Sequence, residues 1–267
     1  MPDPTVAFSG DSPESRSSVH ISGELLNVNL SRSPLARQQL PLPKAQYRSQ
    51  LNDLSLGLTL ADQISTGRIR GPVRRVPAGS RIYGRGDTSD WICLIRIGWA
   101  KTLSTSPQGK LCVLGIEGPG SVLGVAKDAK GSRSEDIVTK TEVQFNVVPR
   151  ADFERFLATP LFGAQWRRHM IELMSERQRT IISFVTLDSE RRLAATLVQL
   201  GTNWGITHDA ATRLRCSLTH EELGQMVGTT RSRIGYFINR FHEMGMVSKS
   251  TDGLVLHMEV LRRFVQG

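Results

Sequence analysis

The chain has 267 residues, which is enough for about two domains of roughly 100–200 residues each. Hydrophobic residues make up 39% and charged residues 22%, a composition that is typical of a globular chain and too polar for a membrane protein. The 34 Lys and Arg residues outnumber the 25 Asp and Glu residues, and the formal charge of +9 favours an anionic partner such as nucleic acid without identifying one.

The cysteine content restricts the possible metal and redox chemistry. Cys93, Cys112 and Cys216 are isolated and odd in number, so one chain cannot supply a disulfide framework or a four-thiolate zinc or iron–sulfur site. This usage fits a reducing compartment. The first residues contain no basic region followed by an apolar run, and no later run reaches the roughly 18 apolar residues that a membrane helix needs. We therefore expect a cytoplasmic protein without a membrane partner.

The common catalytic motifs are absent from the sequence. It contains no Gly-x-Ser-x-Gly elbow, no Walker lysine loop, no His-Glu-x-x-His and no Cys–His pair at a meaningful spacing. The acidic pairs Glu135-Asp136 and Glu221-Glu222 fall in a loop and in a helix cap. We therefore expect no enzyme activity, no catalytic residue and no metal site.

Residues 1–46 are rich in Ser, Pro and Arg and carry only scattered apolar positions, which predicts a mobile tail. A basic arm that touches DNA or a partner is the alternative for this segment. From Lys44 to Thr66 leucines recur with few helix breakers, and this spacing predicts one or two short helices. We assign these helices to a first domain that spans residues 47–159.

The main part of this first domain contains short apolar runs separated by glycines. Between Val73 and Val148 the runs alternate with turns such as Pro77-Ala-Gly and Glu117-Gly-Pro-Gly. No helix longer than one or two turns fits between them. Strands at this spacing predict a small antiparallel barrel or sandwich.

Helical spacing returns at Arg150 with a short helix that Pro160 stops. A long helix follows to about Leu187, and we treat residues 160–188 as a segment of their own. Its residues repeat at alternating steps of four and three, the spacing of a seam between two helices. Packing on the chain's own domain would give the same spacing, but a helix of about 25 residues favours a dimer. The expected interface residues are Met170, Met174, Arg177, Ile181 and Phe184, followed by Asp188.

Residues 189–267 form a third region with two helices around a tight turn. Thr219-His-Glu-Glu is a capping box, in which the Thr219 hydroxyl and the Glu222 carboxylate each accept a backbone N–H of the other residue. Gly228 can end this helix in a left-handed conformation, and a threonine after it can cap the next helix. The order helix, glycine-containing turn, helix is that of a helix-turn-helix unit. Two short strands around Thr251-Asp252 follow and predict a wing.

The second helix of this unit, Thr230–Met244, has an apolar and a polar face. Its polar face holds Ser232, Tyr236, Asn239 and Arg240 and is flanked by Arg233. Arg231 projects from the N-terminal end of the helix, at an angle nearer the apolar face. An α-helix fits a major groove about 12 Å wide, where guanidinium groups match guanine O6 and N7. Together with the capping and turn threonines and the wing lysine, the candidate DNA-binding residues are Thr219, Thr229, Thr230, Arg231, Ser232, Arg233, Tyr236, Arg240 and Lys249.

The stretch from Leu218 to Val247 resembles the winged helix-turn-helix of the Crp/Fnr family of bacterial transcription regulators over a long, gap-free pattern. The glycine-punctuated strands from Arg75 to Val148 are similar to the cyclic-nucleotide-binding-type barrel of that family, and the long helix is similar to its dimerisation helix. The resemblance covers about Val73–Val255. It implies an α+β fold with an N-terminal β-barrel (jelly roll), a long dimerisation helix and a C-terminal winged helix-turn-helix.

This resemblance also implies a function and partners. It implies a DNA-binding transcription regulator, a homodimer that reads an inverted repeat of double-stranded DNA, with RNA polymerase as a further partner. The rival hypothesis is a nucleotide-sensing or protein-interaction module that no longer binds specific DNA. Selection of random duplex DNA by the purified protein separates the two hypotheses.

The resemblance assigns roles at the start of the second helix. Thr230 and Arg231 match the Ser/Thr-Arg pair of the family, which implies a phosphate contact and a guanine contact. The family commonly places Glu directly after that Arg and a further Arg four positions later, where this chain has Ser232 and Tyr236. Without the Glu, an acceptor for cytosine N4 is lost, a contact worth roughly 1–3 kcal/mol against wrong bases. We therefore expect an operator that differs from the usual one of the family.

The stretch from Gly124 to Ser134 corresponds to the cyclic-nucleotide cassette of the family. Arg133-Ser134 matches the phosphate half, but Val125 stands where the ribose-binding Glu would be. The Thr-Ser pair that contacts adenine in the cyclic-AMP receptor falls on Arg177-Gln178. The resemblance therefore implies weak or no binding of cyclic AMP, and we assign no cofactor. The candidate effector-binding residues are Gly124, Arg133, Ser134, Arg177 and Gln178.

Three hypotheses for Arg133 stay open. It binds an anionic effector, it pairs with Glu135 or Asp136 as an ordinary surface arginine, or it belongs to a barrel that binds nothing and acts as a rigid scaffold. An Arg-Ser dipeptide is common, so the residues alone do not decide among these three.

Overall fold

The computed structural model describes residues 51–209, 211–250 and 253–267, without the side chains of 51–55 and Lys249. The tail expected at residues 1–46 and the wing turn expected at Thr251-Asp252 therefore lie outside the described residues. Within the described ranges, no helix has both the length and the apolar character that crossing a bilayer requires.

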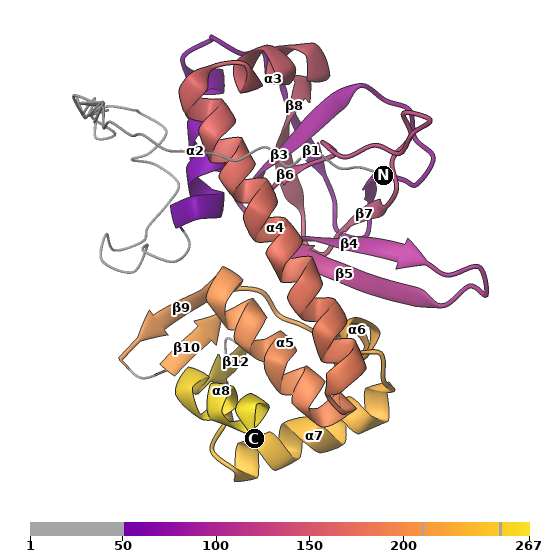
Figure 1. Ribbon diagram of the computed structural model, residues 1–267, viewed down its shortest axis with the longest axis vertical. Coiled ribbons are helices and arrows are strands. Elements are labelled where there is room, and N and C mark those ends of the chain that lie inside the picture. Colours follow the sequence, from indigo (N-terminus) through magenta and orange to yellow (C-terminus); the bar gives the residue numbers. More distant parts are fainter. Residues whose placement is uncertain (1–50, 210, 251–252) are drawn as a thin grey trace, which may run out of the picture. The chain divides into compact units, whose positions relative to one another are not determined.

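The N-terminal part of the described chain is a sandwich of two four-stranded antiparallel sheets (Figure 1). One sheet has the order β1-β8-β3-β6, and the other has the order β2-β7-β4-β5. Because the strands pair within two separate sheets, the expected jelly roll is confirmed as a sandwich and not as a closed barrel. Its strands are β1 (Val73–Val76), β2 (Arg81–Tyr83), β3 (Trp91–Ile97), β4 (Ala100–Thr105), β5 (Leu111–Glu117), β6 (Val122–Leu123), β7 (Asp136–Thr139) and β8 (Val143–Pro149).

Tight turns between these strands depend on glycine, as the sequence predicts. Gly98 joins β3 to β4 with φ +89°, a left-handed conformation that side chains disfavour. A Cβ at Gly98 would also collide with the carbonyl oxygen of Glu142, which begins the connection into β8. Any residue other than glycine at position 98 would force the β3–β4 turn away from the segment that leads into β8.

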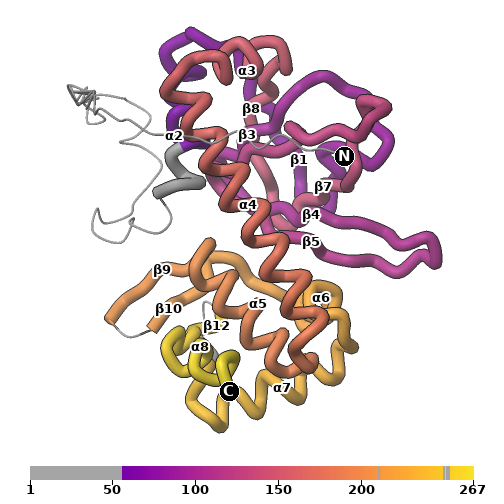
Figure 2. The backbone as a smooth tube through the Cα atoms, viewed as in Figure 1, coloured from indigo at the N-terminus to yellow at the C-terminus, as the bar shows by residue number. Residues whose placement is uncertain are grey.

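Three helices cover one side of the sandwich and continue from it: α2 (Leu51–Ser65), α3 (Arg150–Leu157) and α4 (Pro160–Thr186). The short α3 and the long α4 confirm the expected helices. Pro160 is the first residue of α4, a position where the fixed φ of proline suits a helix start. Phe153 of α3 packs edge-on against Phe162 and Trp166 of α4, with 5.7 Å between ring centroids in both pairs. The chain trace shows α4 running from this corner to the C-terminal region (Figure 2).

The C-terminal region is a winged helix-turn-helix. Its third sheet has the order β11-β12-β10-β9, so the expected wing strands β11 and β12 are confirmed, and the hairpin β9–β10 and the last helix are additions that the sequence did not suggest. The elements are α5 (Ser189–Trp204), β9 (Gly205–His208), β10 (Ala211–Leu214), α6 (His220–Val227), α7 (Arg231–Glu243), β11 (Val247–Ser250), β12 (Gly253–Leu256) and α8 (Met258–Gln266).

One buried apolar cluster continues from the sandwich into the C-terminal region. Leu103, Val113 and Ile116 come from strands β4 and β5, and they belong to the same cluster as Leu223 of α6 and Ile234 of α7. Burial of apolar area contributes roughly 25 cal/mol per Å². The two regions are therefore held together by apolar packing as well as by the chain connection through α4.

Candidate nucleic-acid interface

The first helix of the helix-turn-helix unit is fixed by local hydrogen bonds at its start. The Thr219 hydroxyl accepts from the backbone N–H of Glu222 at 3.1 Å, and the Glu222 carboxylate accepts from the backbone N–H of Thr219 at 3.0 Å. This is the capping box predicted from the sequence. At the other end Gly228 adopts φ +75° and ψ 40°, the predicted left-handed helix end.

The second helix, α7, begins three residues after Gly228. The Thr230 hydroxyl caps it by accepting from the backbone N–H of Arg233 at 3.3 Å. Its apolar face is buried, which turns its polar face away from the core. The buried side chains are Ile234, Phe237, Ile238 and Phe241.

Side chains on the first two turns of α7 form one exposed polar surface. Arg231, Ser232 and Arg233 are exposed, and Tyr236, one turn further, is 64% exposed. The Arg233 guanidinium lies 5.5 Å from the Phe237 ring centroid, so it is partly ordered on the helix. The structure thus leaves four of the nine predicted DNA-binding residues exposed on the first two turns of α7.

The remaining predicted DNA-binding residues differ in their surroundings. Thr219 is exposed at the start of α6, and Thr229 is half-buried in the turn. Arg240 lies two turns along α7 and pairs with Glu190 of α5 at 3.1 Å, so its guanidinium is restrained toward the protein. Lys249 lies in strand β11 opposite Leu254, and its side chain is outside the described part.

Arg192 of α5 is a residue that the sequence did not suggest. Its Nε donates to the Val227 carbonyl oxygen at 3.1 Å, and its Nη1 donates to the Leu187 carbonyl oxygen at 2.6 Å. The guanidinium also lies 5.1 Å from the Phe184 ring centroid. It therefore joins the end of α4 to the end of α6, a link across 35 residues that no local spacing indicates.

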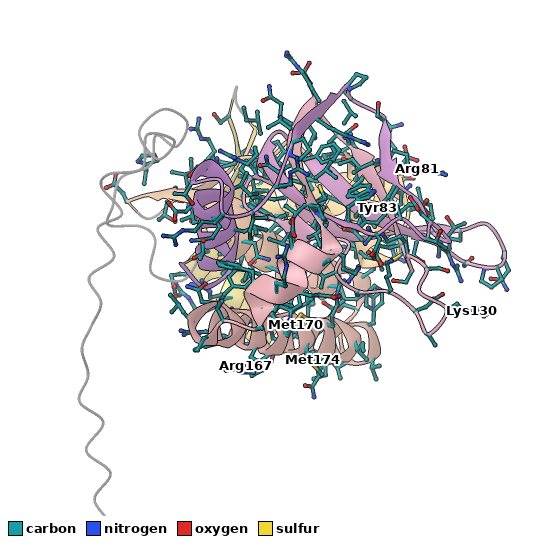
Figure 3. The ribbon with its side chains drawn as sticks, turned by 90° about the horizontal axis from the view of Figure 1, so that it is seen from above. Arg81, Tyr83, Lys130, Arg167, Met170 and Met174 are labelled. Carbon is teal, nitrogen blue, oxygen red and sulfur yellow. The ribbon has the colours of Figure 1, made fainter. Side chains whose placement is uncertain are left out.

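Exposed apolar side chains form a stripe along α4. At several turns the stripe residue is the one that follows the expected seam residue in the sequence. Ile171 is 65% exposed and Val185 is 79% exposed. Of the expected residues, Met174 and Ile181 belong to this stripe (Figure 3 labels Met170 and Met174 on α4).

Three expected seam residues lie beside the stripe rather than on it. Met170 is half-buried, Arg177 donates to the Leu114 carbonyl oxygen of β5 at 3.0 Å, and the Phe184 ring packs under Arg192. Arg177 and Phe184 are nevertheless exposed, so their contacts with their own chain leave the expected seam a prediction. The stripe consists of Ile171, Met174, Gln178, Ile181, Ile182 and Val185.

Arg133 of the sandwich is buried, with 1% of its surface exposed. Its Nη2 donates to the Ser89 carbonyl oxygen at 3.3 Å, and its guanidinium also bonds the carbonyl oxygens of Gly124 and Trp91. The Tyr83 ring centroid lies 4.6 Å from the guanidinium carbon. Burial lowers the pKa of Arg133. The hypothesis of an ordinary surface arginine is therefore wrong.

Of the other expected effector residues, Gly124 contacts Arg133 through its carbonyl oxygen, while Ser134, Arg177 and Gln178 have other surroundings. Ser134 is exposed, and its hydroxyl bonds the Glu135 carboxylate. Arg150 donates to the carbonyl oxygens of Gly124 and Val125 at 2.8 and 3.1 Å. On α4, Gln178 is exposed and Arg177 is engaged with β5. This arrangement does not fit a cyclic nucleotide, because the buried cation is already bonded to backbone oxygens and no carboxylate stands at Val125 for the ribose.

Metal-ligating side chains are not clustered in the described ranges. There, no group of three or more His, Cys, Asp and Glu side chains could hold a metal ion. The buried thiols of Cys93 and Cys216 have pKa values raised by burial.

Comparison with known protein families yields two matches. Residues 191–264 match the model of the Crp-like helix-turn-helix domain, and residues 73–159 match that of the cyclic nucleotide-binding domain. The two models together match more than half of the chain.

Individual relatives are transcription regulators by name. A CRP-like cAMP-activated global transcriptional regulator of Mycobacterium tuberculosis is 25% identical over 173 residues, which are 64% of this chain and 77% of the relative. The transcriptional activator protein anr of Pseudomonas aeruginosa is 24% identical over 210 residues, which are 77% of this chain and 84% of the relative.

Solved structures share the fold. FixK2 from Bradyrhizobium japonicum has a TM-score of 0.63 at 13% identity and covers 72% of this chain and 96% of its own. A CooA mutant from Carboxydothermus hydrogenoformans has a TM-score of 0.62 at 20% identity and covers 73% of this chain and 88% of its own.

Gly228 yields a prediction about the turn of the helix-turn-helix. Gly228→Ala adds left-handed strain of about 1–2 kcal/mol, and its Cβ would lie 3.0 Å from the Phe184 ring. Gly109→Ala is the matched control, since Gly109 has φ +80° with open space around it. In urea unfolding we expect a larger loss of unfolding free energy at Gly228 than at Gly109. Equal losses would show that the Phe184 contact does not constrain the turn.

Proposed function

Since the chain belongs to the Crp/Fnr family of transcription regulators, we propose that it binds double-stranded DNA as a homodimer and reads an inverted repeat with α7. The exposed polar face of α7, formed by Arg231, Ser232, Arg233 and Tyr236, is the observation that carries this proposal. Two such helices would enter successive major grooves with centres about 34–36 Å apart. The family consists of regulators and not of enzymes, and RNA polymerase is the further partner that we propose.

The position of each side chain supports a role at the DNA. Arg231, at the exposed start of α7, is assigned to a guanine, whose O6 and N7 match a guanidinium fork. Arg233 and Tyr236 are assigned to neighbouring bases because they share the same face. Thr219, Thr229 and Thr230 stand at the N-terminal ends of the two helices, where hydroxyl and backbone N–H groups suit phosphates.

A smaller share of the binding is assigned to two further residues. The Glu190 carboxylate partly balances the charge of Arg240. We therefore assign Arg240 to holding α7 against α5 as well as to a phosphate contact. Lys249 is assigned to a phosphate from its place in wing strand β11.

Selection from random duplex DNA tests the function. We expect the wild type to enrich one inverted repeat, and Arg231→Ala to relax the preference at one base pair of each half-site by about 1–3 kcal/mol. Arg74→Ala, which removes the same charge from exposed strand β1, serves as the control and should leave the selected sequence unchanged. No enrichment at moderate salt would favour the alternative, a nucleotide-sensing or protein-interaction module.

The exposed stripe on α4 supports the homodimer. Its residues follow steps of three and four, the spacing of a two-helix seam, and they leave large apolar side chains uncovered in the single chain. We propose that a second copy of α4 covers the stripe.

Met174 lies in the middle of this stripe and provides its test. Met174→Asp places a charge in the seam, so we expect sedimentation to shift from dimer to monomer and affinity for the inverted repeat to fall. Arg179→Asp is the control, because Arg179 is exposed on α4 but lies off the stripe. A Met174→Asp variant that remains dimeric contradicts this seam.

We further propose that the sandwich does not take cyclic AMP. The engaged Arg133 guanidinium and the apolar Val125 support this proposal. In calorimetric titrations with cyclic AMP and cyclic GMP we expect weak binding or none. Micromolar binding of either nucleotide would overturn this view, since Arg133 would then have to leave its backbone partners.

A further inference from the structure

The capping carboxylate of α6 has partners in the sandwich. Lys101 of β4 lies with its Nζ 3.3 Å from Glu222 Oε1, and Lys140, which follows β7, bonds the same oxygen. The Glu222 side chain is 9% exposed. The helix-turn-helix unit is thus tied to the sandwich by two ammonium groups that converge on one carboxylate.

The charged state of Glu222 is stabilised by Lys101 and Lys140, because all three side chains are largely removed from water. Burial alone would raise the pKa of Glu222, but hydrogen bonds from Lys140 and from the backbone N–H of Thr219, with the charges of both lysines, hold it below its ordinary value. In the described part of the chain, Lys101 and Lys140 form ion pairs with Glu222 alone. Loss of the carboxylate would leave two cations at the interface without a counter-charge, which is costly.

Two tryptophans provide a second set of contacts between the sandwich and the C-terminal region. Trp204 of α5 donates from its indole nitrogen to the Ile116 carbonyl oxygen of β5 at 2.9 Å. Its ring meets Trp99, at the start of β4, edge-on with 5.1 Å between centroids. The same face of the sandwich therefore contacts α5 by packing and α6 by charge.

The position of α6 is passed on to α7 through a close helix contact. A Cβ at Gly224 would lie 2.9 Å from the Thr229 carbonyl oxygen, so α6 and the turn before α7 are as close as their backbones permit. Arg192 holds the far end of α6 to the end of α4. Because α6 is held at both ends, α7 follows the sandwich and α4.

We propose that Lys101 and Lys140 are positioning residues for DNA recognition, which act through Glu222 to set the spacing of the two recognition helices in the dimer. This inference rests on the proposed function. The proposed dimer seam lies on α4, and Arg177 bonds α4 to β5. The sandwich is therefore fixed relative to the helix that forms the proposed dimer. The polar face of α7 is exposed while the lysines are engaged, so we assign this state to DNA binding. Release of α6 therefore weakens binding.

The test compares the dependence of DNA affinity on half-site spacing in the wild type and three variants. Glu222→Gln removes the charge but keeps a side chain that completes a capping box. Lys101→Met with Lys140→Met removes the two cations and keeps most of the side-chain stems. Glu221→Gln is the matched control, because Glu221 is exposed on the same turn of α6 without a lysine partner. Each protein is titrated with the selected inverted repeat, with the same repeat lengthened or shortened by one base pair, and with a single half-site.

One base pair rotates the half-sites by about 34–36° and separates them by about 3.4 Å. We expect the wild type and Glu221→Gln to lose roughly tenfold or more in affinity on either change of spacing. Glu222→Gln and the double lysine variant should bind the original repeat about threefold to tenfold more weakly, lose little further on a change of spacing, and bind a half-site as the wild type does.

The outcomes separate this inference from the function on which it rests. If the wild type selects no inverted repeat, the proposed function fails. If the wild type discriminates spacing and both variants discriminate equally well, the positioning role alone is wrong. It is also wrong if half-site affinity falls by the same factor as affinity for the whole repeat, because the substitutions would then have damaged α7 itself.

Discussion

The arrangement of the C-terminal region depends on the Glu222 carboxylate. One oxygen completes the capping box with Thr219, and the other takes the two sandwich lysines. The first contact is local and helps α6 to form, while the second joins segments 82 and 121 residues apart. Secondary structure and the placement of the recognition helix are therefore stabilised by the same side chain, and either is disturbed when this group is lost.

The helix-turn-helix could be predicted from the sequence because its signals are local. Thr219, Gly228 and Thr230 act on backbone groups within four residues, so their spacing is sufficient. The arrangement of the sandwich was harder to predict from the sequence, because β8 pairs with the distant strands β1 and β3. Such non-local pairing leaves no period in the sequence that distinguishes two sheets from a barrel. The Glu222–lysine contact could not be predicted for the same reason.

Two residues show where residue type and spacing stop being informative. Arg177, which we expected in the dimer seam, also donates to β5, and a heptad pattern cannot tell which of two adjacent faces of a helix meets the chain's own sandwich. Arg133 matched a phosphate-binding dipeptide, yet its guanidinium turns inward to backbone oxygens and to the Tyr83 and Trp91 rings. The direction of a long side chain depends on its three-dimensional surroundings.

The exposed stripe on α4 has a consequence for the amount of protein that a cell must keep. When a second copy covers Ile171, Met174, Ile181 and Val185, the folded state gains free energy that rises with protein concentration by mass action. A dilute chain therefore carries an apolar surface in water and unfolds more readily. Proteolysis would then remove unpaired chains first, so that the level of the protein and its state of assembly become linked.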